Sequence, residues 1–176
     1  EITAMPNLVT VGAGGTASSI AGIPFYSSDN SIYTHNVSGT DDTASGNSAY
    51  GISAMDAITT GDNNTAVGRS ALGANTTAGG NVAVGKDALT DNTTGAENVA
   101  VGENSLANNT TAAGNTAVGR GSMFTNTTGA NNVGIGFDAL YANTTGTRNL
   151  AIGKGAYDAS DTENDNIAIG FDAMTT

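Results

Sequence analysis

The strongest constraint on the fold of this chain is a motif that returns every 17 residues. It reads Asn-x-(Ala/Gly)-(Val/Ile)-Gly, and its Asn is called position 0 below. Full copies begin at Asn64, Asn81, Asn98, Asn115, Asn132, Asn149 and Asn166. One period earlier stands Asn47-Ser-Ala-Tyr-Gly51, and Asn30-Ser-Ile-Tyr-Thr34 is a degraded copy before it. So regular a series predicts a repeat protein whose units pack on their neighbours.

Other positions of the unit are constrained as well. Position 4 is Gly in every copy from Gly51 to Gly170, and position 7 is always Ala or Ser. Positions 11 to 13 read Asn-Thr-Thr in five consecutive copies, the first at Asn75 and the last ending at Thr145. Position 8 is large and apolar: Met55, Leu72, Leu89, Leu106, Met123, Leu140, Tyr157 and Met174.

These positions predict an all-β fold, a parallel β-solenoid with one 17-residue coil per unit. The unit is too short for a pair of helices, and a leucine-rich repeat would be longer. Apolar residues at positions 1 and 3, with Ala at position 2, follow the alternation of a strand. Gly at position 4 ends that strand, and Asn-Thr-Thr-Gly has the chemistry of a turn.

The thinness of such a coil predicts self-association. One side of the strand carries Val or Ile, and the other carries mainly Ala and Gly instead of charged residues. We expect a neighbouring chain to cover the Ala/Gly side, because a single coil has little interior of its own. A homotrimer is the first choice.

The units Asn81-Val-Ala-Val-Gly85, Asn149-Leu-Ala-Ile-Gly153 and Asn166-Ile-Ala-Ile-Gly170, each followed three residues later by Ala, resemble a known repeat. They are similar to the head repeats of trimeric autotransporter adhesins, and similar repeats occur in phage tail fibres. The resemblance covers residues 47–174 and implies a left-handed β-roll that trimerises and binds host or matrix ligands through its outer surface. The family's usual repeat is near 14 residues, so the 17-residue unit is closer to the longer form found in phage fibres.

Composition narrows the possible partners. The formal net charge of −11, with only five basic residues, argues against nucleic acid. There is no Cys, so neither disulfides nor thiolate metal sites are possible. No apolar run is long enough to span a bilayer, so membrane insertion is not expected. Because the chain begins at Glu1, we expect a processed N-terminus or a fragment.

Several residue series are candidates for binding. The position-0 Asn column is interpreted as an amide stack along the solenoid axis, with a ligand surface as the alternative. The Asn-Thr-Thr series is interpreted as turns; its alternatives are an ice-binding array of Thr residues and glycosylation sequons. These sequons begin at Asn75, Asn92, Asn109, Asn126 and Asn143.

Charged residues are interpreted without a ligand. Position 5 holds Arg69, Lys86, Arg120 and Lys154, and the intervening Glu103 and Phe137 should relieve their mutual repulsion. Position 6 holds Asp87, Asp138 and Asp172, and one turn gathers Asp158, Asp161, Glu163 and Asp165. That last group is a weak candidate for Ca²⁺. His35 is the only His, and no catalytic motif is present. We therefore predict no catalytic, cofactor-binding or metal residues, and no enzyme.

The chain is predicted to contain three segments. Residues 1–29 would cap the solenoid, anchor it to a larger particle or pair with another subunit. Residues 30–46 would form a degenerate first coil, and residues 47–176 the regular coils. The last coil stops before its turn, so we expect its open end to dock on another subunit or on more of a longer fibre.

These features predict a structural or attachment protein, part of a phage tail fibre or cell-surface adhesin. Its expected location is extracellular, on a virion or a bacterial surface. Its partners would be further copies of itself and a host receptor or glycan. The alternatives are the subunit of a filament that polymerises end to end and, in another class, an ice-binding solenoid. Thermal hysteresis of the purified protein would distinguish the last.

Overall fold

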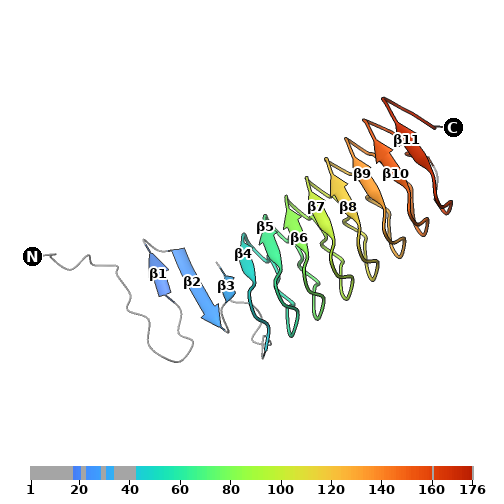
Figure 1. The fold of residues 1–176 in the computed structure, drawn as a ribbon. Helices are drawn as coiled ribbons and strands as arrows, with labels where there is room; N and C mark the ends of the chain where they lie inside the picture. The colour runs from blue at the N-terminus through green and yellow to red at the C-terminus, as the bar shows by residue number, and fades with distance from the viewer. Residues whose placement is uncertain (1–17, 21–22, 29–30, 34–42, 160, 176) are drawn as a thin grey trace, which may run out of the picture.

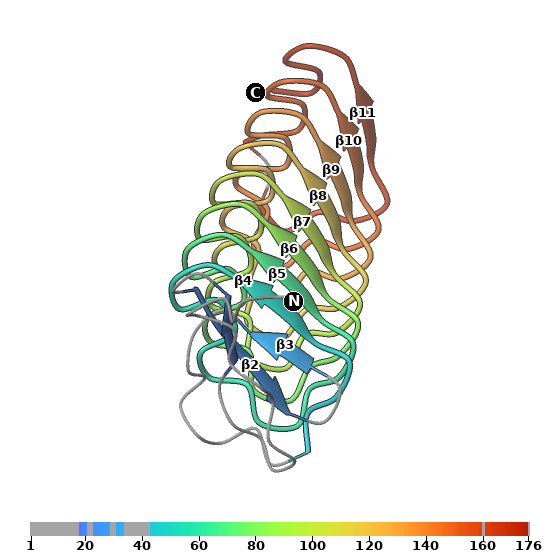
Figure 2. The same cartoon turned by 90° about the vertical axis from the view of Figure 1, so that its left-hand side faces the viewer.

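A computed structural model describes residues 18–20, 23–28, 31–33, 43–159 and 161–175 of the 176-residue chain. The described residues contain strands and turns and no helix. Successive coils rise in one direction and place one short strand each side by side (Figure 1). Viewed along the stack, the coils enclose a narrow interior (Figure 2). The predicted parallel β-solenoid with a 17-residue coil is therefore confirmed.

The sheet has the register that the repeat predicts. Its regular strands are β4 (Ser48–Tyr50), β5 (Thr65–Val67), β6 (Val82–Val84), β7 (Val99–Val101), β8 (Thr116–Val118), β9 (Val133–Ile135), β10 (Leu150–Ile152) and β11 (Ile167–Ile169). Neighbours are parallel, and each residue pairs with the residue 17 positions later, as Ala83 does with Ala100. Columns of equivalent side chains thus run along the axis.

The N-terminal strands continue the same sheet with antiparallel pairing. β1 (Ser18–Ile20) pairs antiparallel with β2 (Ile23–Ser28), which pairs antiparallel with β3 (Ser31–Tyr33). β3 is parallel to β4, and Ile32 lies opposite Ser48, only 16 residues later. The alignment of the degraded copy with the first regular one is therefore wrong by one residue, because the hairpin and not the 17-residue period sets the register of β3.

The inner side of the regular strands carries Ala, or Gly134 in β9. Ala66, Ala83 and Ala100 at position 2 are fully buried, whereas Val67 and Ile152 at position 3 are 41% and 36% exposed. The expectation that a neighbouring chain covers the Ala side is therefore wrong, since that side faces the interior of its own coil. The large side chains of position 8 already fill most of the narrow interior from the opposite side of the coil. The strand can therefore place only small groups, such as the methyl group of Ala, in the space that remains. The uncovered side is the Val/Ile side.

The side chains of position 8 fill this interior, and their backbone has an unusual conformation. Leu72, Leu89 and Leu106 are fully buried and have φ values of 52°, 50° and 50°. Residues other than Gly are uncommon in this left-handed region, and it strongly disfavours side chains that branch at Cβ. The conformation explains why position 8 is Leu, Met or Tyr in every copy, and never Val or Ile.

Gly at position 4 allows the coils to approach closely. Gly102 has a φ of 136°, and a Cβ on it would lie 2.5 Å from the carbonyl oxygen of Gly119 in the next coil. No side chain fits at this corner. The prediction that Gly at position 4 ends each regular strand is confirmed, and these glycines have φ values of 132° to 140°.

Candidate interaction surfaces

The position-0 Asn side chains lie inside the solenoid. In the coil that begins at Asn98, the side-chain Nδ2 donates to the carbonyl oxygen of Ala112, at 2.8 Å. The Oδ1 of Asn98 accepts the backbone N–H of Asn115, at 2.9 Å. The predicted amide stack is confirmed, and because the column is buried it offers no ligand surface.

A second amide ladder runs through position 11. Nδ2 of Asn109 donates to Oδ1 of Asn92, at 2.8 Å, and to the carbonyl oxygen of Ala112, at 3.0 Å. These Asn residues are fully buried, so glycosylation at their sequons would require the coil to open. The ladder ends at Asn143, whose buried Oδ1 has no donor among the described residues. Position 11 of the following coil is Ser160 instead of Asn.

The two Thr positions of the turn differ in their surroundings. At position 12 the hydroxyl donates to the carbonyl oxygen of the equivalent residue in the next coil, as Thr93 does to Thr110 at 3.0 Å. At position 13 the side chain is exposed, as in Thr94 and Thr111. The turn prediction is supported by these contacts, and only the position-13 column presents its hydroxyls to solvent.

Position 5 forms a mixed column of charges and aromatic rings. Glu103 lies 3.2 Å from Nζ of Lys86 and 3.6 Å from Nε of Arg120. The Phe137 ring lies between Arg120 and Lys154, whose cationic groups are 5.4 Å and 5.8 Å from the ring centroid. Cation–π contacts of this kind are favourable. The interpretation that these residues relieve repulsion within the column agrees with the geometry.

The acidic residues near the C-terminus do not converge. Asp165 is paired with Arg148, at 2.6 Å, and this hydrogen bond holds the pKa of Asp165 below its usual value. Within the described residues, no three carboxylate or imidazole side chains are close enough to hold a metal ion together. His35 lies outside the described residues. The described residues contain no helix that could span a membrane.

The Val/Ile side of the sheet is an uncharged outer face. We call positions 1 and 3 of β4–β11 the sheet face. Its position-3 residues are Tyr50, Val67, Val84, Val101, Val118, Ile135, Ile152 and Ile169. Position 1 is also apolar, except at Ser48, Thr65 and Thr116. The residues of the sheet face are partly or largely exposed, and no charged residue stands on it in any coil.

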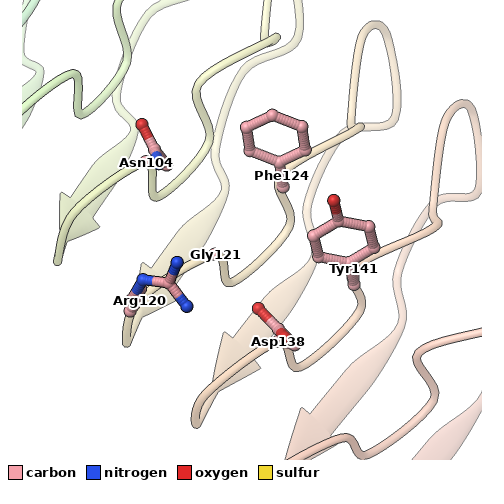
Figure 3. Close-up of a pocket in the computed structure, with 6 residues that line it drawn as sticks. All are labelled: Asn104, Arg120, Gly121, Phe124, Asp138 and Tyr141. Atoms are coloured by element: carbon pink, nitrogen blue, oxygen red, sulfur yellow. The ribbon is translucent and has the colours of Figure 1, made fainter.

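Sequence reasoning missed an aromatic pair at position 9. Phe124 and Tyr141 stack with centroids 5.4 Å apart and ring planes 11° from parallel. They border a surface pocket of about 260 Å³ that is also lined by Asn104, Arg120, Gly121 and Asp138 (Figure 3). Burial raises the pKa of Asp138, against the opposing charge of Arg120. The signal in the sequence was two neighbouring aromatic residues at a position that is otherwise polar or small.

Comparison of the chain with family models, with curated proteins and with solved structures found no match. What can be said of its function therefore comes from its own residues. The described residues form a parallel β-solenoid with an uncharged apolar outer face and an aromatic-lined pocket.

Proposed function

We propose that this chain is a β-solenoid segment of an extracellular attachment fibre, a phage tail fibre or cell-surface adhesin, that assembles as a trimer through its sheet face. The observation that carries the proposal is the row of aligned apolar side chains on β4–β11, which are half-buried on β6–β8 and more exposed towards both ends, as at Ile169 with 64%. An uncharged patch of aligned apolar side chains is typical of protein–protein contact.

Charge favours another copy of the same chain as the partner. The chain has a net charge of −11, so two copies repel each other over most of their surfaces. The sheet face has no carboxylates, and copies can meet there without burying unpaired charge. A second copy also has the same coil spacing, so its side-chain rows match the rows of this face along the whole stack.

A trimer can bury more surface of each chain than a dimer. Eight strands about 4.8 Å apart, with two side-chain columns about 7 Å apart, give a face of roughly 270 Å² per chain. A stable interface buries about 800 Å² per partner. In a trimer each chain meets two neighbours and can also bury flanking residues such as Phe137 and Phe171, which are 40% and 71% exposed.

The ice-binding alternative has less support. A Thr array that orders water needs free hydroxyls in regular ranks, whereas the hydroxyls at position 12 donate to backbone carbonyls of the next coil. One exposed rank, at position 13, is left for water.

The proposal is tested by adding charge to the sheet face. Val101→Lys places an ammonium group in the middle of the face, and Thr94→Lys places the same group on the exposed turn of a neighbouring coil. Sedimentation equilibrium should show a trimer for the wild type and Thr94→Lys, and a monomer for Val101→Lys. Equal masses for both variants would reject the sheet face as the interface. A series of much larger species would favour the end-to-end filament.

A further inference from the structure

The repeat departs from its own pattern at the pocket beside Phe124 and Tyr141. Position 9 is Asp, Gly, Thr or Ala in the other regular coils, and only these two are aromatic. Between them and the position-5 column lies Gly121, where most coils have Ser, Asp or Asn. Two departures in adjoining coils thus supply an aromatic wall and remove the side chain that would fill the space in front of it.

The polar groups around this space offer both donors and acceptors. The guanidinium of Arg120 donates only, the carboxylate of Asp138 accepts, and the amide of Asn104 does both. Arg120 is held from two sides, because Glu103 lies 3.6 Å from its Nε and Phe137 lies under its guanidinium. In Figure 3 the aromatic rings lie on one side of Gly121, and Arg120 on the other.

We propose that this pocket binds one pyranose ring of a saccharide. One cation and one anion balance each other, so the pocket selects neither a metal cation nor a simple anion. A neutral ring with several hydroxyls can accept from Arg120 and donate to Asp138, while its C–H groups contact Phe124 and Tyr141. The volume of about 260 Å³ is just below the usual range for small-molecule pockets, which suits a single ring.

This inference deepens the proposed attachment role, and it rests on that role only for its biological meaning. All six lining residues come from one chain, so binding does not depend on the trimer. A monomer that binds a saccharide would reject the trimer and keep the pocket. A trimer that binds no saccharide would reject the pocket and keep the trimer.

The test is saturation-transfer NMR with the methyl glycosides of D-glucose, D-galactose, D-mannose and N-acetyl-D-glucosamine. At least one should receive magnetisation from the wild type, with a Kd of about 1–10 mM, as expected for one small polar ring. Tyr141→Thr, which restores a residue found at position 9 in other coils, should weaken this binding about tenfold or more.

Two glycines at position 6 provide a matched pair of variants. Gly121→Asn fills the pocket, and Gly155→Asn makes the same change two coils away. Both glycines have similar φ values, 67° and 62°, and Asn104 occupies the same position at 58°. Gly121→Asn should abolish the transfer and Gly155→Asn should retain it. The absence of transfer to all four glycosides, or equal transfer with both variants, would overturn the proposal.

Discussion

Oδ1 of Asn81 accepts two hydrogen bonds from Asn98 in the next coil, one from its backbone N–H at 2.9 Å and one from its side-chain Nδ2 at 3.2 Å. The same side-chain-to-backbone bond recurs from Asn47 to Asn166. A buried amide that lost its partner would be costly, so each Asn fixes the register of the coil that follows.

Asn98→Ala should therefore destabilise the solenoid strongly. It leaves the buried Asn115 N–H without its acceptor and removes one of the two donors to the Ala112 carbonyl, whose other donor is Asn109. We expect a loss of about 2–5 kcal/mol in the free energy of unfolding, measured by urea denaturation followed by circular dichroism. Asn108→Ala is the control, because position 10 is half-buried and is already Ala in other coils, as at Ala74. Similar losses in both variants would contradict the role of the ladder.

Leu106→Ile should be more harmful than its unchanged volume suggests. The φ of 50° at Leu106 is poorly compatible with a β-branched side chain, so we expect a loss of about 1–3 kcal/mol in unfolding free energy. Leu106→Met, which copies Met123 at the same position, should cost less than about 1.5 kcal/mol. Thermal unfolding of the two variants measures the difference. A smaller loss of stability in Leu106→Ile than in Leu106→Met would show that backbone conformation does not restrict the residue at position 8.

Asp138 and Asp165 should contribute to stability with opposite pH dependence. Burial raises the pKa of Asp138 above its ordinary 3.8, so its contribution is present below that value and is lost as pH rises through the folded-state pKa. The Arg148 hydrogen bond lowers the pKa of Asp165, so its contribution is present above 3.8 and is lost as pH falls through the folded-state pKa.

The comparison needs Asp138→Asn and Asp165→Asn, with thermal midpoints measured at about pH 3 and pH 7, on either side of the usual carboxyl range. Relative to the wild type, Asp138→Asn should gain stability from the lower to the higher pH, and Asp165→Asn should lose it. Changes of the same sign in both variants would contradict the assigned environments.

The sequence predicted the period, the strands, the sharp bend at Gly and the amide stack, because each depends on contacts between identical positions one period apart. It did not predict which side of the strand faces inwards. Alternation separates Val84 from Ala83 but leaves the direction open, and Val is usually the inner residue. Here the Leu residues of position 8 already fill the narrow interior, so Ala is the residue that fits.

Two other features depend on departures from the period. The register of β3 is set by its antiparallel pairing with β2, and a search for 17-residue spacing could not find it. The pocket arises where Phe124, Tyr141 and Gly121 break the pattern in two adjoining coils. A motif search weighs what recurs, so it passed over the two aromatic residues, which occur in one pair of adjoining coils.

The most direct test of the proposed function is the mass of the intact wild-type assembly, measured by native mass spectrometry. Self-association through the sheet face predicts a species of three times the 17.3 kDa mass of the chain. A stable species of 17.3 kDa at micromolar concentration, with its Val and Ile columns open to water, would contradict it.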